Sequence, residues 1–119
     1  MVSTRSDRLP RRYDMALEGN QRKLDAADAL GALADEAGVA LPELALAWVL
    51  NHPTVTSAII GPRTMEHLQS HLPAAELELD AALLDRIDEI VPPGVNVNHE
   101  DAGWADPSLE PAFRRRTGT

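Results

Sequence analysis

The chain has 119 residues and no cysteine. Without cysteine there is no disulfide framework, no thiolate metal site and no thiol nucleophile, so several classes of enzyme are excluded. Aromatic residues are also scarce, at 3% of the chain, whereas 44% of the residues are hydrophobic and most of these are alanine or leucine. Because alanine and leucine favour helices and aromatic residues favour strands, the composition predicts a helix-rich globular domain with a small core.

Long apolar runs are missing as well. No segment approaches the roughly 20 apolar residues of a membrane span, and the polar, arginine-rich start lacks the apolar core of a secretory signal. Eleven basic residues stand against 19 acidic ones, which gives a formal net charge of −8. Such an excess repels nucleic acid and anionic membranes, so we expect neither as a partner. Because neither a membrane span nor a secretory signal is recognisable, we expect a cytoplasmic location. The arginines near both ends are given no binding role.

Four segments have helical patterns, over residues 20–37, 42–51, 65–72 and 81–91. Asn20 is expected to be the N-cap of the first helix and Gly38 its stop, while Thr64 and Asp80 are expected to cap the last two. Residues 1–19 form a polar leader or loop, residues 20–91 hold the regular elements, and residues 92–119 form a C-terminal extension. Apolar residues at helical spacing in the first helix predict its buried stripe: Leu24, Ala27, Leu30, Ala34 and Ala37.

One stretch has the pattern of a strand. Residues 54–60, in "TVTSAIIG", are β-branched and apolar at consecutive positions, which is typical of a parallel strand covered on both faces. A lone strand leaves its backbone groups unpaired, and each buried one costs on the order of 1–3 kcal/mol. The predicted strand therefore needs partners that the rest of the chain does not offer.

A glycine, an arginine and a threonine follow this predicted strand and precede a helix, as Gly61, Arg63 and Thr64. A glycine lets a phosphate approach the backbone, the helix start offers N–H groups, and arginine is suited to bind a phosphate monoester. The pattern favours an anion site, although a glycine between a strand and a helix is common and Thr64 could be only a cap. We thus keep a purely structural interpretation open.

His67 and His71 lie four residues apart on one face of the helix that follows. They could face the same anion, or they could simply be surface histidines. Their spacing could also hold a metal ion, but the glutamate of the zinc-protease motif and a third ligand are lacking, so we predict no metal site. Carboxylates such as Asp85 and Asp88 fit a solvated helix face, and Ser57 and Tyr13 have no suitable partner. No catalytic group is predicted.

The segment "LADEAGVALPELALAWVLNHPTVTSAIIGPRTMEHL", followed by "LDRIDEIVPPG", resembles the C-terminal part of the aldo-keto reductases. The likeness covers roughly residues 3–116. In that family a (β/α)8 barrel binds NADP(H) at its C-terminal face, so the resemblance implies an α/β fold: an incomplete (β/α)8 TIM barrel, mostly helical, with one strand. It also implies that the partners of this strand lie upstream.

The same resemblance assigns a task to residues 61–64. In relatives the corresponding loop and helix start bind the adenosine 2′-phosphate end of the cofactor, so Gly61, Pro62, Arg63 and Thr64 look like that phosphate clamp. His67 and His71 stand where the family usually has glutamine and asparagine in contact with the cofactor. The exchange at His67 also weakens a capping box.

The resemblance further implies that the catalytic aspartate, tyrosine, lysine and histidine lie upstream, and none of them maps onto this chain. We therefore expect a C-terminal piece of an NADPH-dependent aldehyde or ketone reductase, from a truncated or split gene or a longer polypeptide, without reductase activity by itself. Its partners would be the missing barrel portion or a second copy. The alternative is a non-catalytic helical protein-interaction module.

Overall fold

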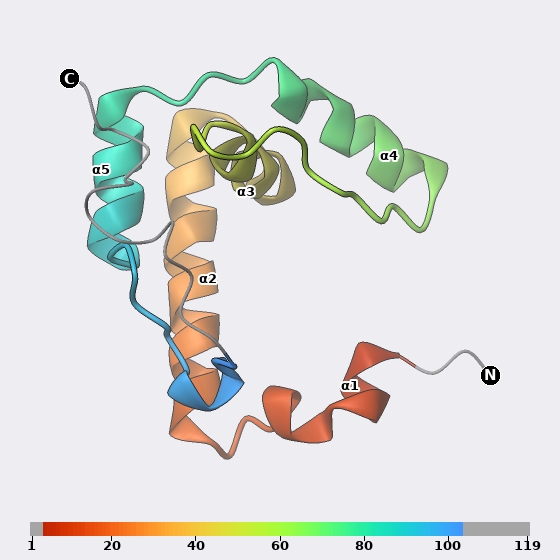
Figure 1. The fold of residues 1–119 in the computed structure, drawn as a ribbon, viewed down its shortest axis with the longest axis vertical. Helices are drawn as coiled ribbons and strands as arrows, with labels where there is room; N and C mark the ends of the chain where they lie inside the picture. The colour runs from red at the N-terminus through yellow and green to blue at the C-terminus, as the bar shows by residue number, and fades with distance from the viewer. Residues whose placement is uncertain (1–3, 104–119) are drawn as a thin grey trace.

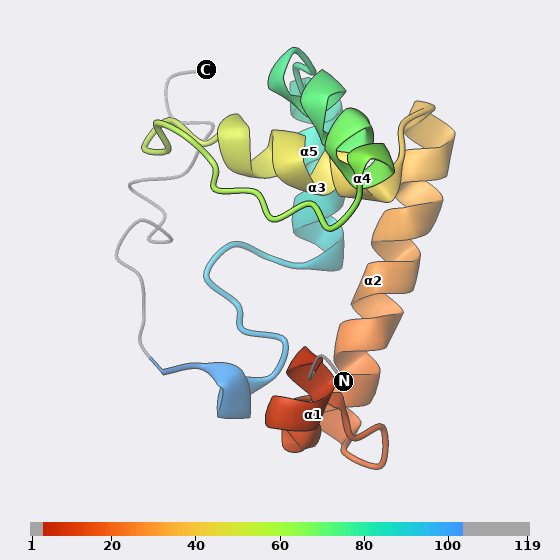
Figure 2. The ribbon, with the colours of Figure 1, turned by 90° about the vertical axis from the view of Figure 1, so that its right-hand side faces the viewer.

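Helices carry the regular structure of residues 4–103, which are the residues that the computed structural model describes. The longest helix, α2, forms a column, α5 runs antiparallel beside it, and α3 crosses its far end (Figure 1). Short helices gather at the opposite end, where α1 and η3 lie near the start of α2 (Figure 2). In chain order the elements are α1 (Arg5–Arg8), η1 (Pro10–Tyr13), α2 (Glu18–Ala37), α3 (Leu41–Leu50), α4 (Met65–His71), η2 (Leu72–Ala75), α5 (Ala81–Ile90) and η3 (His99–Asp101).

The ends of the helices follow local chemistry. Gly38 ends α2 in the left-handed conformation with a φ of 73°, and its N–H donates to the carbonyls of Ala34 and Asp35. Asp80 caps α5, since its carboxylate accepts from the backbone N–H of Leu83 at 2.8 Å. At α1, the hydroxyl and backbone N–H of Thr4 both donate to Asp7, and these bonds hold the pKa of Asp7 below its usual value.

Asn20 does not cap α2, so that prediction is wrong. The helix begins at Glu18, with Leu17 at the N-cap, and Asn20 lies inside the first turn with only 2% of its surface exposed. Its side-chain amide donates to the carbonyls of Arg11 and Asp14, each at 2.8 Å. The asparagine instead satisfies backbone groups of the preceding segment, which contains α1 and η1 where a leader or loop was expected.

The core lies where α2, α3 and α5 meet, and it is small. Only part of the stripe expected on α2 is buried: Ala34 is fully buried and Leu30 half-buried, whereas Leu24 is 51% exposed and Ala27 and Ala37 are exposed. Leu33, one position away from that stripe, takes part instead. The buried apolar residues are Leu33, Ala34, Leu44, Ala47, Ala74, Leu79, Leu84 and Ile87.

The strand expected over residues 54–60 is absent, because residues 4–103 contain no strand. The segment instead runs as an irregular connection between α3 and α4 (Figure 1), with Ile59 fully exposed and Ile60 39% exposed. A strand forms only through backbone hydrogen bonds to a neighbouring strand, and the described residues provide none. The β-branched sequence alone cannot replace that neighbour.

Asn51, at the end of α3, anchors the segment that leads into α5. Its amide donates to the carbonyl of Leu77 at 3.1 Å, and its side-chain oxygen accepts from the N–H of Leu79 at 3.3 Å. The Asn51 side chain thus bonds to one backbone carbonyl and one backbone N–H of this segment, as a neighbouring strand would. These bonds hold the segment where Leu79 is buried in the core. Within residues 4–103, no helix is long and apolar enough to cross a membrane.

Candidate functional site

Residues 61–64 lie in the connection that leads from α3 to the start of α4 (Figure 1). Gly61, Arg63 and Thr64 are exposed, and Pro62 is half-buried. Among the described residues, Arg63 has no salt bridge and no side-chain hydrogen bond, whereas five other basic side chains pair with acids. A guanidinium in this state has all of its donors available to an anion from outside the described chain.

Thr64 begins α4 as its N-cap. Its hydroxyl accepts from the backbone N–H of His67 at 3.1 Å, and its carbonyl accepts from the N–H of Leu68 at 3.1 Å. In a capping box the third helical residue would bind back to the N–H of Thr64, but within residues 4–103 the His67 side chain makes no such bond. The hydroxyl is thus committed to the helix, while the N–H groups of Met65 and Glu66 remain available.

Nothing in the described chain requires a glycine at position 61. Gly61 does not have a positive φ, and a Cβ placed on it would meet no atom within 4 Å. As far as residues 4–103 are concerned, an alanine would fit at this position. The open space beside this backbone is therefore compatible with the close approach of a group that residues 4–103 do not supply.

The two histidines of α4 differ in their surroundings. His67 is exposed, whereas His71 is half-buried, and its Nδ1 is buried without a hydrogen-bond partner in the described residues. Glu66 places an acidic group in the first turn of α4, where it opposes the binding of an anion. In the described part of the chain no three histidine or acidic side chains come together in a way that could hold a metal ion.

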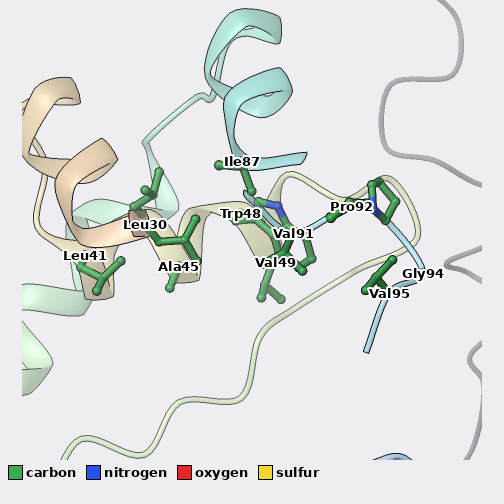
Figure 3. A pocket seen from close by; sticks show the side chains of 12 residues that line it. Leu30, Leu41, Ala45, Trp48, Val49, Ile87, Val91, Pro92, Gly94 and Val95 are labelled. Carbon is green, nitrogen blue, oxygen red and sulfur yellow. The ribbon is translucent and has the colours of Figure 1, made fainter. Parts of the chain in front are cut away.

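A second feature, which the sequence did not point to, is an apolar groove between α2, α3, α5 and the segment that follows α5 (Figure 3). Its volume is about 450 Å³, and it contains none of residues 61–64. The nearly continuous apolar run at 44–49 and the Pro92-Pro93-Gly94 turn were the available signals for it. The groove is lined by Leu30, Leu41, Leu44, Ala45, Trp48, Val49, Ile87, Val91, Pro92, Pro93, Gly94 and Val95.

Comparison with known proteins gives a family and two relatives. The family model described as "Aldo/keto reductase family" matches residues 2–92. An uncharacterized oxidoreductase, YrpG of Bacillus subtilis, is 39% identical over 72 residues, which are 60% of this chain and 22% of that protein. A probable voltage-gated potassium channel subunit beta of Arabidopsis thaliana is 34% identical over 61 residues, or 50% of this chain and 19% of that protein. No solved structure matches the chain.

The chain therefore spans about a fifth of the length of each of these relatives. The family match, in contrast, covers most of the chain and includes α2, α3, the connection with residues 61–64, α4 and α5. The resemblance seen in the sequence is confirmed by this match. The chain belongs to the aldo/keto reductase family.

Proposed function

We propose that residues 61–64 bind the adenosine 2′-phosphate of NADP(H) when this chain is part of a complete aldo/keto reductase barrel. The carrying observation is Arg63, an exposed guanidinium without an acidic partner in the described residues, two positions from the open backbone of Gly61. Family membership supports the choice of a nicotinamide cofactor as the source of the phosphate. The free N–H groups of Met65 and Glu66 would add donors on the same side of the helix start.

The parent activity would be the NADPH-dependent reduction of aldehydes or ketones, in which the bound cofactor supplies the hydride. This chain would contribute an anchoring point at the far end of the cofactor. Arg63 would fix the phosphate with paired hydrogen bonds, while Thr64 holds the start of α4 in place through its bond to His67. The catalytic groups of such a reductase would lie in the rest of the barrel, so we propose that the chain alone has no reductase activity.

The proposal is tested by the affinities of NADPH and NADH for a complete barrel that contains this segment. We expect NADPH to bind more tightly, and Arg63→Ala to weaken NADPH binding about 10- to 100-fold while NADH binding stays the same. Arg86→Ala is the matched control, since Arg86 is also an exposed arginine but pairs with Glu36 at 2.6 Å. Equal affinities for the two cofactors in the unmodified barrel would refute the proposal.

A second candidate is a non-catalytic interaction module. It is favoured by the apolar groove of about 450 Å³, because an exposed apolar surface of this kind is typical of protein contacts. The Arabidopsis relative is named as a probable channel subunit, and a subunit of a larger assembly supports the same candidate. Substitution of Arg63 distinguishes the two candidate functions. It should impair a cofactor site and leave contacts made through the groove unchanged.

A further inference from the structure

The segment before α2 and the segment after α5 meet at the end of the molecule opposite α3. Figures 1 and 2 show α1 and η3 at the same end of the molecule as the start of α2. No local pattern in the sequence predicts this meeting of a polar first segment with residues near the other end of the chain. The contacts between them join residues that are 78 and 89 positions apart.

Asn20 forms the buried centre of this meeting point. Besides donating to the carbonyls of Arg11 and Asp14, its side-chain oxygen accepts from the amide of Asn98 at 3.2 Å. Asn98 in turn caps η3, because its side-chain oxygen accepts from the N–H of Glu100 at 3.2 Å. One buried side chain thereby links η1, α2 and η3 by hydrogen bonds.

Gly19 permits the close approach of these segments. A Cβ at this position would lie 2.7 Å from the side-chain oxygen of Asn98 and 2.8 Å from its Cγ, which is closer than real contacts allow. The absence of a side chain at Gly19 therefore lets Asn98 reach Asn20. This is a packing reason for glycine that does not involve a turn.

Charged pairs surround the neutral centre. Asp101 accepts from Lys23 at 2.7 Å and pairs with Arg12 at 3.4 Å, and its side chain is only 28% exposed. Lys23 also donates to the carbonyl of Arg12 at 3.0 Å, so it binds both segments at once. Arg11 and Glu100 add a pair at 3.1 Å that is largely exposed. Exposed pairs contribute little individually and weaken with salt, whereas several sharing one site reinforce one another.

From these contacts we infer a clasp, a salt-sensitive fastening that holds residues 98–101 against α2 and the segment before it. The clasp consists of Arg11, Arg12, Asn20, Lys23, Asn98, Glu100 and Asp101. At low ionic strength the charged pairs keep the clasp closed. At high ionic strength the charged pairs weaken, and the single bond between Asn98 and Asn20 no longer suffices to hold residues 98–101 against α2. The clasp contains none of residues 61–64 and does not depend on the proposed cofactor site.

The chain offers a specific test, because Lys23 is its single lysine. A carbodiimide joins an amine to a carboxylate in direct contact, so products at a lysine side chain can come only from Lys23. In the full 119-residue chain, monomeric and at low salt, we expect mass spectrometry to find a Lys23–Asp101 bond. Its yield, relative to bonds from Lys23 to the acids of its own helix, should fall at least about five-fold in 1 M NaCl, where the Debye length is about 3 Å.

Two variants leave both reacting groups intact. Asn98→Ala removes the bond to Asn20. Arg11→Glu places two like charges next to each other at Glu100, on an exposed surface where the substitution should not prevent folding. Each variant should lower the relative yield several-fold. Asn96→Ala is the matched control, an exposed asparagine of the same segment, and should have no effect. Absence of the Lys23–Asp101 bond in the unmodified monomer, or a yield indifferent to salt and to both variants, would overturn the clasp.

Discussion

Gly61 and Gly19 are glycines for different reasons, and the difference can be measured. Gly19 is explained by packing within the chain, because a Cβ there would displace the side chain of Asn98 from its bond to Asn20. Gly61 is not, since a Cβ there would meet nothing within 4 Å. A residue that internal packing does not explain is a candidate for contact with something outside the described chain, and the proposed phosphate is such a group.

In a complete barrel we expect Gly61→Ala to leave the melting temperature unchanged or slightly raised. Alanine reduces the conformational entropy of the unfolded chain, which can stabilise the folded state by about 0.4–1 kcal/mol. The same substitution should weaken NADPH binding several-fold. Gly19→Ala should do the reverse, with a lower melting temperature and unchanged cofactor affinity. Thermal unfolding and cofactor titration of both variants check this, and a Gly61→Ala barrel with undiminished affinity would speak against contact at that backbone.

At the level of elements, the helices could be predicted because their signals are local. Gly38, Thr64 and Asp80 act within one turn of their own helix, and the apolar stripe of α5 is set by its own spacing, with Leu84 and Ile87 buried. Asn20 has the same chemistry as a cap, but its partners are carbonyls of the preceding segment. Such partners depend on the tertiary fold, and for that reason local patterns missed both the true start of α2 and the clasp.

The prediction of a strand over residues 54–60 is wrong for a related reason. Its sequence favours a strand, yet a strand is a property of two segments, and residues 4–103 contain no second one. The apolar side chains that a barrel would bury therefore stay exposed, with Ile59 at 102% and Ile60 at 39%. The position of the candidate site depends on this segment as well, because residues 61–64 directly follow it and it has no strand partner in residues 4–103.

This leads to a prediction for the isolated 119-residue chain. With an unpaired segment 54–60 and a small core, we expect it to unfold over a broad range or to associate, instead of unfolding cooperatively as a monomer. Calorimetry combined with sedimentation would measure both properties. A sharp two-state transition of a monomer would show that the core described here suffices, and that segment 54–60 needs no partner.

At the scale of the whole molecule, we propose that the chain contributes one end of a cofactor site whose other walls lie in the rest of a barrel. It spans about a fifth of the length of the two relatives described above. Among its described residues, 61–66 provide hydrogen-bond donors that an anion could reach. The apolar groove and the exposed isoleucines are surfaces that a surrounding barrel would cover. Cofactor binding, on this account, is a property of the complete barrel to which residues 61–64 contribute the phosphate end.

The central claim is tested most directly by the backbone amide signals of residues 61–67 in a complete barrel, recorded by nuclear magnetic resonance with two ligands. Adenosine 2′,5′-bisphosphate carries the 2′-phosphate and adenosine 5′-monophosphate does not. We expect the bisphosphate to shift the amide signals of Gly61, Arg63, Met65 and Glu66 at concentrations where the monophosphate does not shift them. Identical shifts with both ligands, or shifts confined to other parts of the barrel, would contradict it.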